Sequence, residues 1–173
     1  MKKGKFFSIE IDKLTNSIEN VITAEIFPTE CERVIKNSKI ILKKNEWNFN
    51  WLLEIKNEKK EVYKLITQFN PSIIHGLISI SDEGDHIFMH LIEAAQFNRG
   101  KKKLYKGVAG NLIAFACKKS FEKKYAGVVA FEAKSKLIEH YKKSLQAKHI
   151  SANRMFIDTN ESRILVNQYF QNK

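Results

Sequence analysis

The pattern of hydrophobic and polar residues predicts irregular elements in the first third of the chain. Residues 5–11 (KFFSIEI) alternate weakly and predict a strand. Residues 12–24 are polar with apolar positions at helical spacing, so we expect a helix there, and a second helix over residues 29–42. The segment 45–57, which holds both tryptophans, fits neither pattern clearly.

Stronger strand patterns follow. Residues 62–69 alternate between apolar and polar positions, and residues 74–81 are apolar and β-branched. Residues 86–94 are apolar on both faces, which places this strand in the centre of a sheet. The run Asp-Glu-Gly-Asp at 82–85 predicts a hairpin turn between the last two strands, because Asp and Gly tolerate the backbone conformations of such turns.

The rest of the chain alternates helices and strands. Helical spacing or strand patterns cover, in order, residues 108–123 (helix), 127–131 (strand), 134–145 (helix), 154–158 (strand) and 158–173 (C-terminal helix). This alternation predicts an α/β class, or an α+β mixed sheet, because the earlier strands look antiparallel. Helices are expected to flank a central, mostly antiparallel sheet.

Length and composition predict one domain over residues 1–173, with no linker rich in glycine or proline. The longest apolar runs, such as residues 112–117, are far shorter than the ~20 residues of a membrane span. The apolar stub after the first lysines is too short for a signal peptide, so we expect a cytoplasmic protein with no membrane partner. Two cysteines, Cys31 and Cys117, cannot build a disulfide framework, which agrees with that location.

The net charge of +11 favours an anionic partner. Only four of the 30 basic residues are arginine, the residue that best reads base edges, so specific nucleic-acid recognition is not expected. The scattered lysines instead predict a solvated surface that attracts a small anionic ligand.

The segment with most chemical content runs from a buried strand through a basic loop into a helix (NRGKKKLYKGVAGNLIAFA, 98–116). Gly107 and Gly110 would let a ligand approach the backbone, and the free N–H groups at the helix start suit a phosphate or pyrophosphate. Four lysines surround the same point: Lys101, Lys102, Lys103 and Lys106. The alternative is an ordinary strand-to-helix turn. Neither the P-loop pattern nor the GxGxxG dinucleotide fingerprint occurs.

This segment resembles the coenzyme A pyrophosphate loop of the GNAT (GCN5-related) N-acetyltransferase superfamily. Gly107-Val108-Ala109 is similar to its G-x-G/A core, although Leu104 stands where the family has Gln or Arg. Downstream, Tyr141 falls on the family tyrosine and His140 on its aromatic neighbour. The resemblance covers about residues 60–157.

The resemblance implies an acyl-CoA N-acyltransferase fold in which residues 60–157 bind acetyl-CoA and residues 1–59 face an amine acceptor. The acetyl group would pass from acetyl-CoA directly to the amine. The implied cofactor-binding residues are Leu91, Ile92, Lys106, Gly107, Val108, Ala109, Gly110 and Asn111.

The resemblance also implies catalytic roles. Tyr141 would protonate the leaving thiolate, while backbone N–H groups at residues 91–93 would polarise the thioester carbonyl. Glu93 is the first candidate for the base, since burial on an apolar strand is expected to raise its pKa, and His90 and Glu132 are the alternatives.

Other classes remain open or are disfavoured. His86 and His90 would lie ~13 Å apart on a strand, too far to share a metal ion, so no metal site is expected. The main alternative function is a catalytically silent module of the same fold whose basic surface binds a protein or nucleic acid. In that case side chains such as Phe97 or Trp51 should block the cleft. The acceptor is not identified, and a homodimer is allowed.

Overall fold

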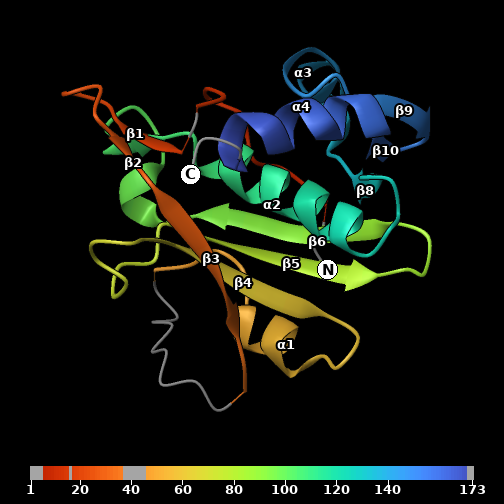
Figure 1. Ribbon diagram of the computed structural model, residues 1–173, viewed down its shortest axis with the longest axis horizontal. Coiled ribbons are helices and arrows are strands. Elements are labelled where there is room, and N and C mark those ends of the chain that lie inside the picture. Colours follow the sequence, from red (N-terminus) through yellow and green to blue (C-terminus); the bar gives the residue numbers. More distant parts are fainter. Residues whose placement is uncertain (1–5, 16, 37–45, 171–173) are drawn as a thin grey trace.

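The computed structural model describes residues 6–15, 17–36 and 46–170. They form a seven-stranded sheet of order β3-β4-β5-β6-β8-β10-β9 and a small sheet of order β2-β1-β7 (Figure 1). The strands are β1 (Ile18–Asn20), β2 (Ile26–Phe27), β3 (Thr29–Val34), β4 (Glu61–Thr67), β5 (Gly76–Asp82), β6 (Ile87–Ala94), β7 (Tyr105–Lys106), β8 (Val129–Glu132), β9 (Lys148–Ser151) and β10 (Arg154–Ile157). The helices are α1 (Trp51–Lys56), α2 (Val108–Glu122), α3 (Ile138–Ser144) and α4 (Thr159–Phe170), with 3₁₀ turns η1 (Gln96–Asn98) and η2 (Ser135–Leu137).

The large sheet confirms the predicted mixed, mostly antiparallel architecture. All neighbouring strands in it are antiparallel except β6 and β8. Strand β6 is the middle strand, as its apolar sequence predicts. The predicted hairpin joins β5 to β6, with Gly84 at φ 88° and its N–H donating to Asp82 Oδ1 over 2.9 Å. This positive φ suits glycine.

Helices cover both faces of the sheet (Figure 1). α2 packs on β5 and β6, and α4 packs on the outer side of α2, around the main core cluster. α1 lies on the opposite face, where Trp51 packs with Val34, Val62, Leu77 and Leu91. The described residues contain no helix long and apolar enough to span a membrane.

A β-bulge in β6 changes which side chains face α2. Ser79 pairs with Leu91 but Ile80 pairs with Met89, so His90 is an extra residue in β6. Met89 belongs to the core under α2, whereas Leu91, two residues on, belongs to the cluster under α1. The bulge therefore exchanges the two faces for the last part of the strand, where the candidate site lies.

Strands β6 and β8 separate at this same end of the sheet. They pair only over Ile87–Met89 and Val129–Phe131, while β6 continues to Ala94 and β8 ends at Glu132. The two strands therefore leave a splay between them.

The helices predicted in the first third of the chain are wrong. Residues 12–24 contain β1 and a turn, and the predicted helix over 29–42 begins as β3, with residues 37–42 outside the described residues. Pairing of β3 with β4 overrides the weak helical pattern. The strand predicted over 5–11 is an extended segment with one bridge, between Phe7 and Ala133, and residue 5 is outside the described residues. Strand β9 was not predicted, because its four exposed residues have no apolar alternation.

Candidate functional site

A cavity of about 490 Å³ lies at the splay end of β6. One wall is the end of β6, a second is the loop before α2 with the first turn of that helix, and a third is the extended segment near the N-terminus. We call residues 6–15 the N-terminal strap (red in Figure 1). The lining residues from these walls include Ile92, Glu93, Ala94, Asn98, Arg99, Lys101, Lys103, Val108, Ala109, Ser8, Ile9, Glu10 and Asp12.

The N-terminus of α2 points its backbone donors at the strap. Gly107 caps the helix with φ 88°, a left-handed conformation that glycine adopts without strain. Its N–H donates to Asp12 Oδ1 over 3.1 Å. Val108 and Ala109, both predicted to bind the cofactor, line the cavity. This helix end is thus electropositive and carries a carboxylate in the structure.

Two other predicted cofactor residues face the interior of the protein. The Asn111 side chain is buried and donates to Thr29 Oγ1 over 2.8 Å. A side chain at Gly110 would collide with the Tyr169 hydroxyl of α4, and Leu14 of the strap lies 2.9 Å from the same point. The Asn111 side chain and the lack of one at Gly110 therefore allow β3, α4 and the strap to pack against α2.

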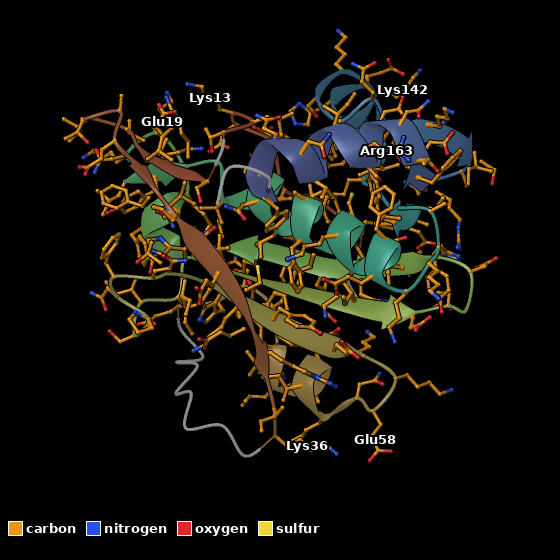
Figure 2. The ribbon with its side chains drawn as sticks, viewed as in Figure 1. Lys13, Glu19, Lys36, Glu58, Lys142 and Arg163 are labelled. Carbon is orange, nitrogen blue, oxygen red and sulfur yellow. The ribbon has the colours of Figure 1, made fainter. Side chains whose placement is uncertain are left out.

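Two of the four lysines near this helix end have carboxylate partners. Lys103 pairs with Asp12 over 3.0 Å, and Lys106 of β7 pairs with Glu19 of β1 over 3.0 Å. Lys13 also contacts Glu19, over 3.1 Å, and Figure 2 shows this pair near the outer edge of the molecule. Hydrogen bonds from Lys106 and Lys13 lower the pKa of Glu19 below its ordinary value. Lys101 lines the cavity beside them.

Leu91 and Ile92 follow the bulge on β6 directly. Ile92 lines the cavity and belongs to the core under α2, whereas Leu91 points to the opposite face. Bulges often re-aim side chains beside active sites, and this one sets the orientation of Glu93 as well.

Glu93 lies on the cavity wall with both carboxylate oxygens engaged. It is buried, accepts from the Trp51 indole N–H over 2.8 Å and from the Asn48 backbone N–H over 2.6 Å, and pairs with Arg99 over 3.3 Å. The Phe49 N–H adds a fourth, longer contact of 3.4 Å. The carboxylate therefore ties the loop before α1 to the loop after β6. Trp51 is a core residue, and Phe49 lines the cavity.

Tyr141 is buried behind the strap. Its hydroxyl donates to the backbone carbonyl of Ile9, and its ring contacts Phe7 and Phe131 at centroid distances of 5.4 Å. Burial, aided by the charge of Glu10, raises the pKa of Tyr141 well above its ordinary value. Ile9 also lines the cavity, so the strap lies between the Tyr141 hydroxyl and the cavity.

The neighbouring aromatic position of the resemblance also contacts the strap. His140 Nε2 accepts from the Ile11 backbone N–H over 2.8 Å. The structure thus brings Glu93, Val108 and Ala109 to the cavity, and it places Tyr141 and His140 against the strap.

Sequence reasoning missed three residues of the site: Asp12, Asn98 and Arg99. Asn98 Oδ1 and Arg99 Nε are buried and have no hydrogen-bond partner among the described residues, and both side chains line the cavity. Buried polar atoms are normally paired, so these two mark a place suited to a polar ligand. The available signal for Arg99 was its position: it is one of only four arginines in the chain, and it stands in the basic loop before α2.

The alternative bases lie elsewhere. His90, the extra residue of the bulge, contacts Ser81 Oγ over 2.7 Å, and neither His90 nor Glu132 lines the cavity. Within residues 6–15, 17–36 and 46–170, no three His, Cys, Asp or Glu side chains group closely enough to hold a metal ion.

Comparison with solved structures identifies the fold of the chain. No protein-family profile matches the chain, and no curated protein matches it by sequence. Solved structures do match. The AtaT–AtaR complex with acetyl-CoA bound has a TM-score of 0.56 at 11% identity, covering 80% of this chain and 98% of that one. An AtaT mutant toxin bound to the C-terminus of the antitoxin AtaR has a TM-score of 0.53 at 12% identity, covering 79% and 97%.

A further match is a KacTA–DNA complex, with a TM-score of 0.52 at 12% identity over 84% of this chain and 99% of that one. These neighbours have the GNAT fold. The chain has the GNAT fold. The sheet order, the single parallel pair β6/β8 and the splay between those strands are the features that position the cavity.

Proposed function

We propose that this protein binds acetyl-CoA and transfers its acetyl group to an amine. The observation that carries the proposal is the cavity at the β6/β8 splay, which lies against a helix N-terminus opened by Gly107 in the left-handed conformation. A helix N-terminus of this kind suits a pyrophosphate. The GNAT fold supports it, and two of the matched structures have acetyl-CoA bound.

The chain offers groups for each end of such a donor. The N-terminal turn of α2, with Gly107, Val108 and Ala109, and the lysines Lys101, Lys103 and Lys106 would hold the phosphates. The unpaired Asn98 Oδ1 would accept from an amide N–H, and the unpaired Arg99 Nε would donate to a carbonyl. When bound, acetyl-CoA would supply a thioester, which is an activated acyl group.

Tyr141 and the end of β6 would act on the reacting atoms. Backbone N–H groups at residues 91–93 would polarise the carbonyl, and the Tyr141 hydroxyl would give its proton to the leaving thiolate. The Tyr141 hydroxyl is protonated at neutral pH, as a general acid must be, while the burial that raises its pKa makes it a weaker proton donor.

Glu93 is our candidate for the group that takes the proton of the acceptor amine. Its place on the cavity wall supports that role. Its four donors also give it a second role, because they position the loop of Asn48 and Phe49 on the acceptor side.

Calorimetric titration with acetyl-CoA tests the proposal, with two neighbouring lysines as a matched pair. Lys101 lines the cavity, whereas the adjacent Lys102 does not. We expect Lys101→Ala to weaken binding about fivefold, the effect of one lost exposed phosphate contact, and Lys102→Ala to leave it unchanged. Equal effects of the two would argue for general charge attraction. An absence of binding in the wild type and in Asp12→Ala and Phe7→Ala, two variants that each remove a contact of the N-terminal strap, would refute the proposal.

A second candidate function is the silent module, and one observation favours it. Tyr141 is fully buried, and the strap separates it from the cavity. Two structural neighbours are complexes with an antitoxin segment and with DNA. The discriminating result is turnover. Incubation with acetyl-CoA and a panel of primary amines, followed by mass spectrometry, should yield acetylated product for an enzyme and none for a silent module that still binds acetyl-CoA.

A further inference from the structure

The N-terminal strap runs along the whole length of the candidate cofactor site. It begins at the end of β8, where the Phe7 N–H and carbonyl pair with Glu132 O and the Lys134 N–H. It ends at α2, where Asp12 and Thr15 lie beside Gly107. The strap therefore connects the splay of the sheet to the N-terminus of the helix, the two ends that the proposed donor would occupy.

The lower part of the strap is anchored by burial. Phe7 is 2% exposed, and its ring centroid lies 4.9 Å from that of Phe131, at a tilt, and 5.4 Å from that of Tyr141, edge to face. Ile11 is also buried, and its N–H donates to His140. These contacts bury two apolar side chains and satisfy backbone groups, so the segment is part of the folded core.

At the middle of the strap, the Ile9 carbonyl accepts the Tyr141 hydroxyl. That hydroxyl is the donor that the proposed chemistry assigns to the leaving thiolate. While the strap is in place, the proton of Tyr141 is directed at the protein's own backbone.

At the upper end, the Asp12 carboxylate takes the place suited to a phosphate. It accepts from the Gly107 N–H and pairs with Lys103, so it uses both the helix N-terminus and a cavity lysine. Thr15 closes over the same glycine, and its N–H donates to the Tyr169 hydroxyl over 2.9 Å. The strap thus supplies an anion at one end of the site and a carbonyl acceptor at the other.

From these contacts we propose that residues 6–15 act as an intramolecular competitor of acyl-CoA, which must be displaced before the donor binds. The inference rests on the proposed function, since it names what regulates the same site. Under such competition, the observed dissociation constant equals the intrinsic one divided by the fraction of molecules whose strap is open. Weakening the strap must therefore tighten donor binding.

The test is acetyl-CoA calorimetry on full-length wild type, Asp12→Ala and Glu10→Ala. Asp12→Ala removes the acceptor of the Gly107 N–H, and we expect it to tighten binding about tenfold. Glu10 is an exposed carboxylate on the same strap and the same cavity, so Glu10→Ala controls for the loss of a negative charge beside the phosphates. Equal tightening by the two variants would overturn the proposal, because it would reduce the effect to charge.

A neutral variant and a direct measurement of the strap complete the test. Phe7→Ala loosens the other end of the strap without changing charge, and it should also tighten binding. Hydrogen exchange of the Phe7, Ile11 and Thr15 amides reports the strap itself. These amides should be protected in the free wild type and should exchange faster when acetyl-CoA saturates the protein.

The outcomes separate the two proposals. Stoichiometric binding with the strap amides still protected would overturn the competition and leave the proposed function standing. Fast exchange of these amides in the free wild type would also overturn it. Absence of binding in all variants, with the strap amides of Asp12→Ala and Phe7→Ala exchanging freely, would refute acetyl-CoA as the ligand and with it the competition.

Discussion

The carboxylate of Asp12 accepts a hydrogen bond of 3.1 Å from the backbone N–H of Gly107, 95 residues further along the chain. This contact joins the strap to the start of α2 at the point where the left-handed glycine exposes its donor. A substitution at Gly107 is therefore expected to disturb both the helix cap and the strap.

Substitution of Gly107 should show this double role. Gly107 and Gly84 share φ 88°, but a side chain at Gly107 would meet Thr15 and Ser17, whereas nothing lies within 4 Å at Gly84. Gly84→Ala should cost ~1 kcal/mol from backbone strain, and Gly107→Ala at least ~2 kcal/mol because collision adds to the same strain. Urea unfolding of the two variants measures the difference; equal costs would mean that the strap does not press on Gly107.

Tyr141→Phe should separate chemistry from folding. If the phenol protonates the leaving thiolate, the variant should lose ~10²–10⁴-fold in acetyl transfer while still binding acetyl-CoA. Tyr125, whose hydroxyl bonds to Asp82 at the surface, provides the control Tyr125→Phe, which should retain full activity. An active Tyr141→Phe would exclude Tyr141 as the acid.

Glu93→Gln should reveal how much of the role of Glu93 is structural. Loss of a buried charge that accepts three N–H groups and pairs with Arg99 should cost ~2–4 kcal/mol in the free energy of unfolding. The exposed Glu132→Gln should be neutral. If Glu93 is also the base, the acidic limb of the pH profile of kcat/KM should disappear in the variant; an unchanged limb would leave it a positioning role only.

His75 should make the fold sensitive to acid. Burial lowers its pKa to about 4, and Asn98 Nδ2 donates to its Nδ1 over 3.1 Å, which requires a neutral ring. Because the unfolded state takes up a proton at a higher pH than the folded state, stability should fall by up to ~3 kcal/mol as the pH drops from about 6.5 to 4.

Urea unfolding at pH 7.5 and pH 5 measures this loss. His75→Gln should reduce the difference between the two pH values, and substitution of the exposed His149 should not. If His75→Gln keeps the whole difference, other groups cause the acid sensitivity.

The two cysteines should react at different rates. Burial raises the pKa of the Cys117 thiol to about 12, and Cys117 of α2 accepts a hydrogen bond from the Ser162 hydroxyl of α4. Cys31 of β3 is partly exposed. A thiol reagent should therefore modify Cys31 in the native protein and Cys117 only on unfolding, since the thiolate is the reactive form. Rapid labelling of both would show that α4 opens readily.

The sequence predicted the second half of the fold because its patterns are strong. The run 86–94 is apolar on both faces and became the central β6, and the broad apolar stripe of residues 108–123 became α2. The hairpin at Gly84 followed from turn chemistry alone. Around the site, the family resemblance implied Val108 and Ala109 as cofactor-binding residues, and both line the cavity.

The first third could not be predicted from local patterns, because its structure depends on distant partners. Residues 6–15 have one bridge, and several of their hydrogen bonds reach α3, α4 and the start of α2, more than 90 residues away. Such contacts leave no periodicity in the sequence. The bulge at His90 was equally invisible, and it decides which face of the sheet Glu93 occupies.

The extra residue at the bulge in β6 determines which face of the sheet the Glu93 side chain occupies. Before His90, odd-numbered side chains of β6 face α2; after it, even-numbered ones do. If His90 were instead paired in strict alternation, without the bulge, the carboxylate would turn from Trp51 toward the core under α2 and Ile92 would take its place; deleting His90 would remove the bulge and keep Glu93 facing Trp51. The bulge at His90 therefore determines whether the side of the sheet that faces Trp51 carries a carboxylate or an apolar side chain at this position.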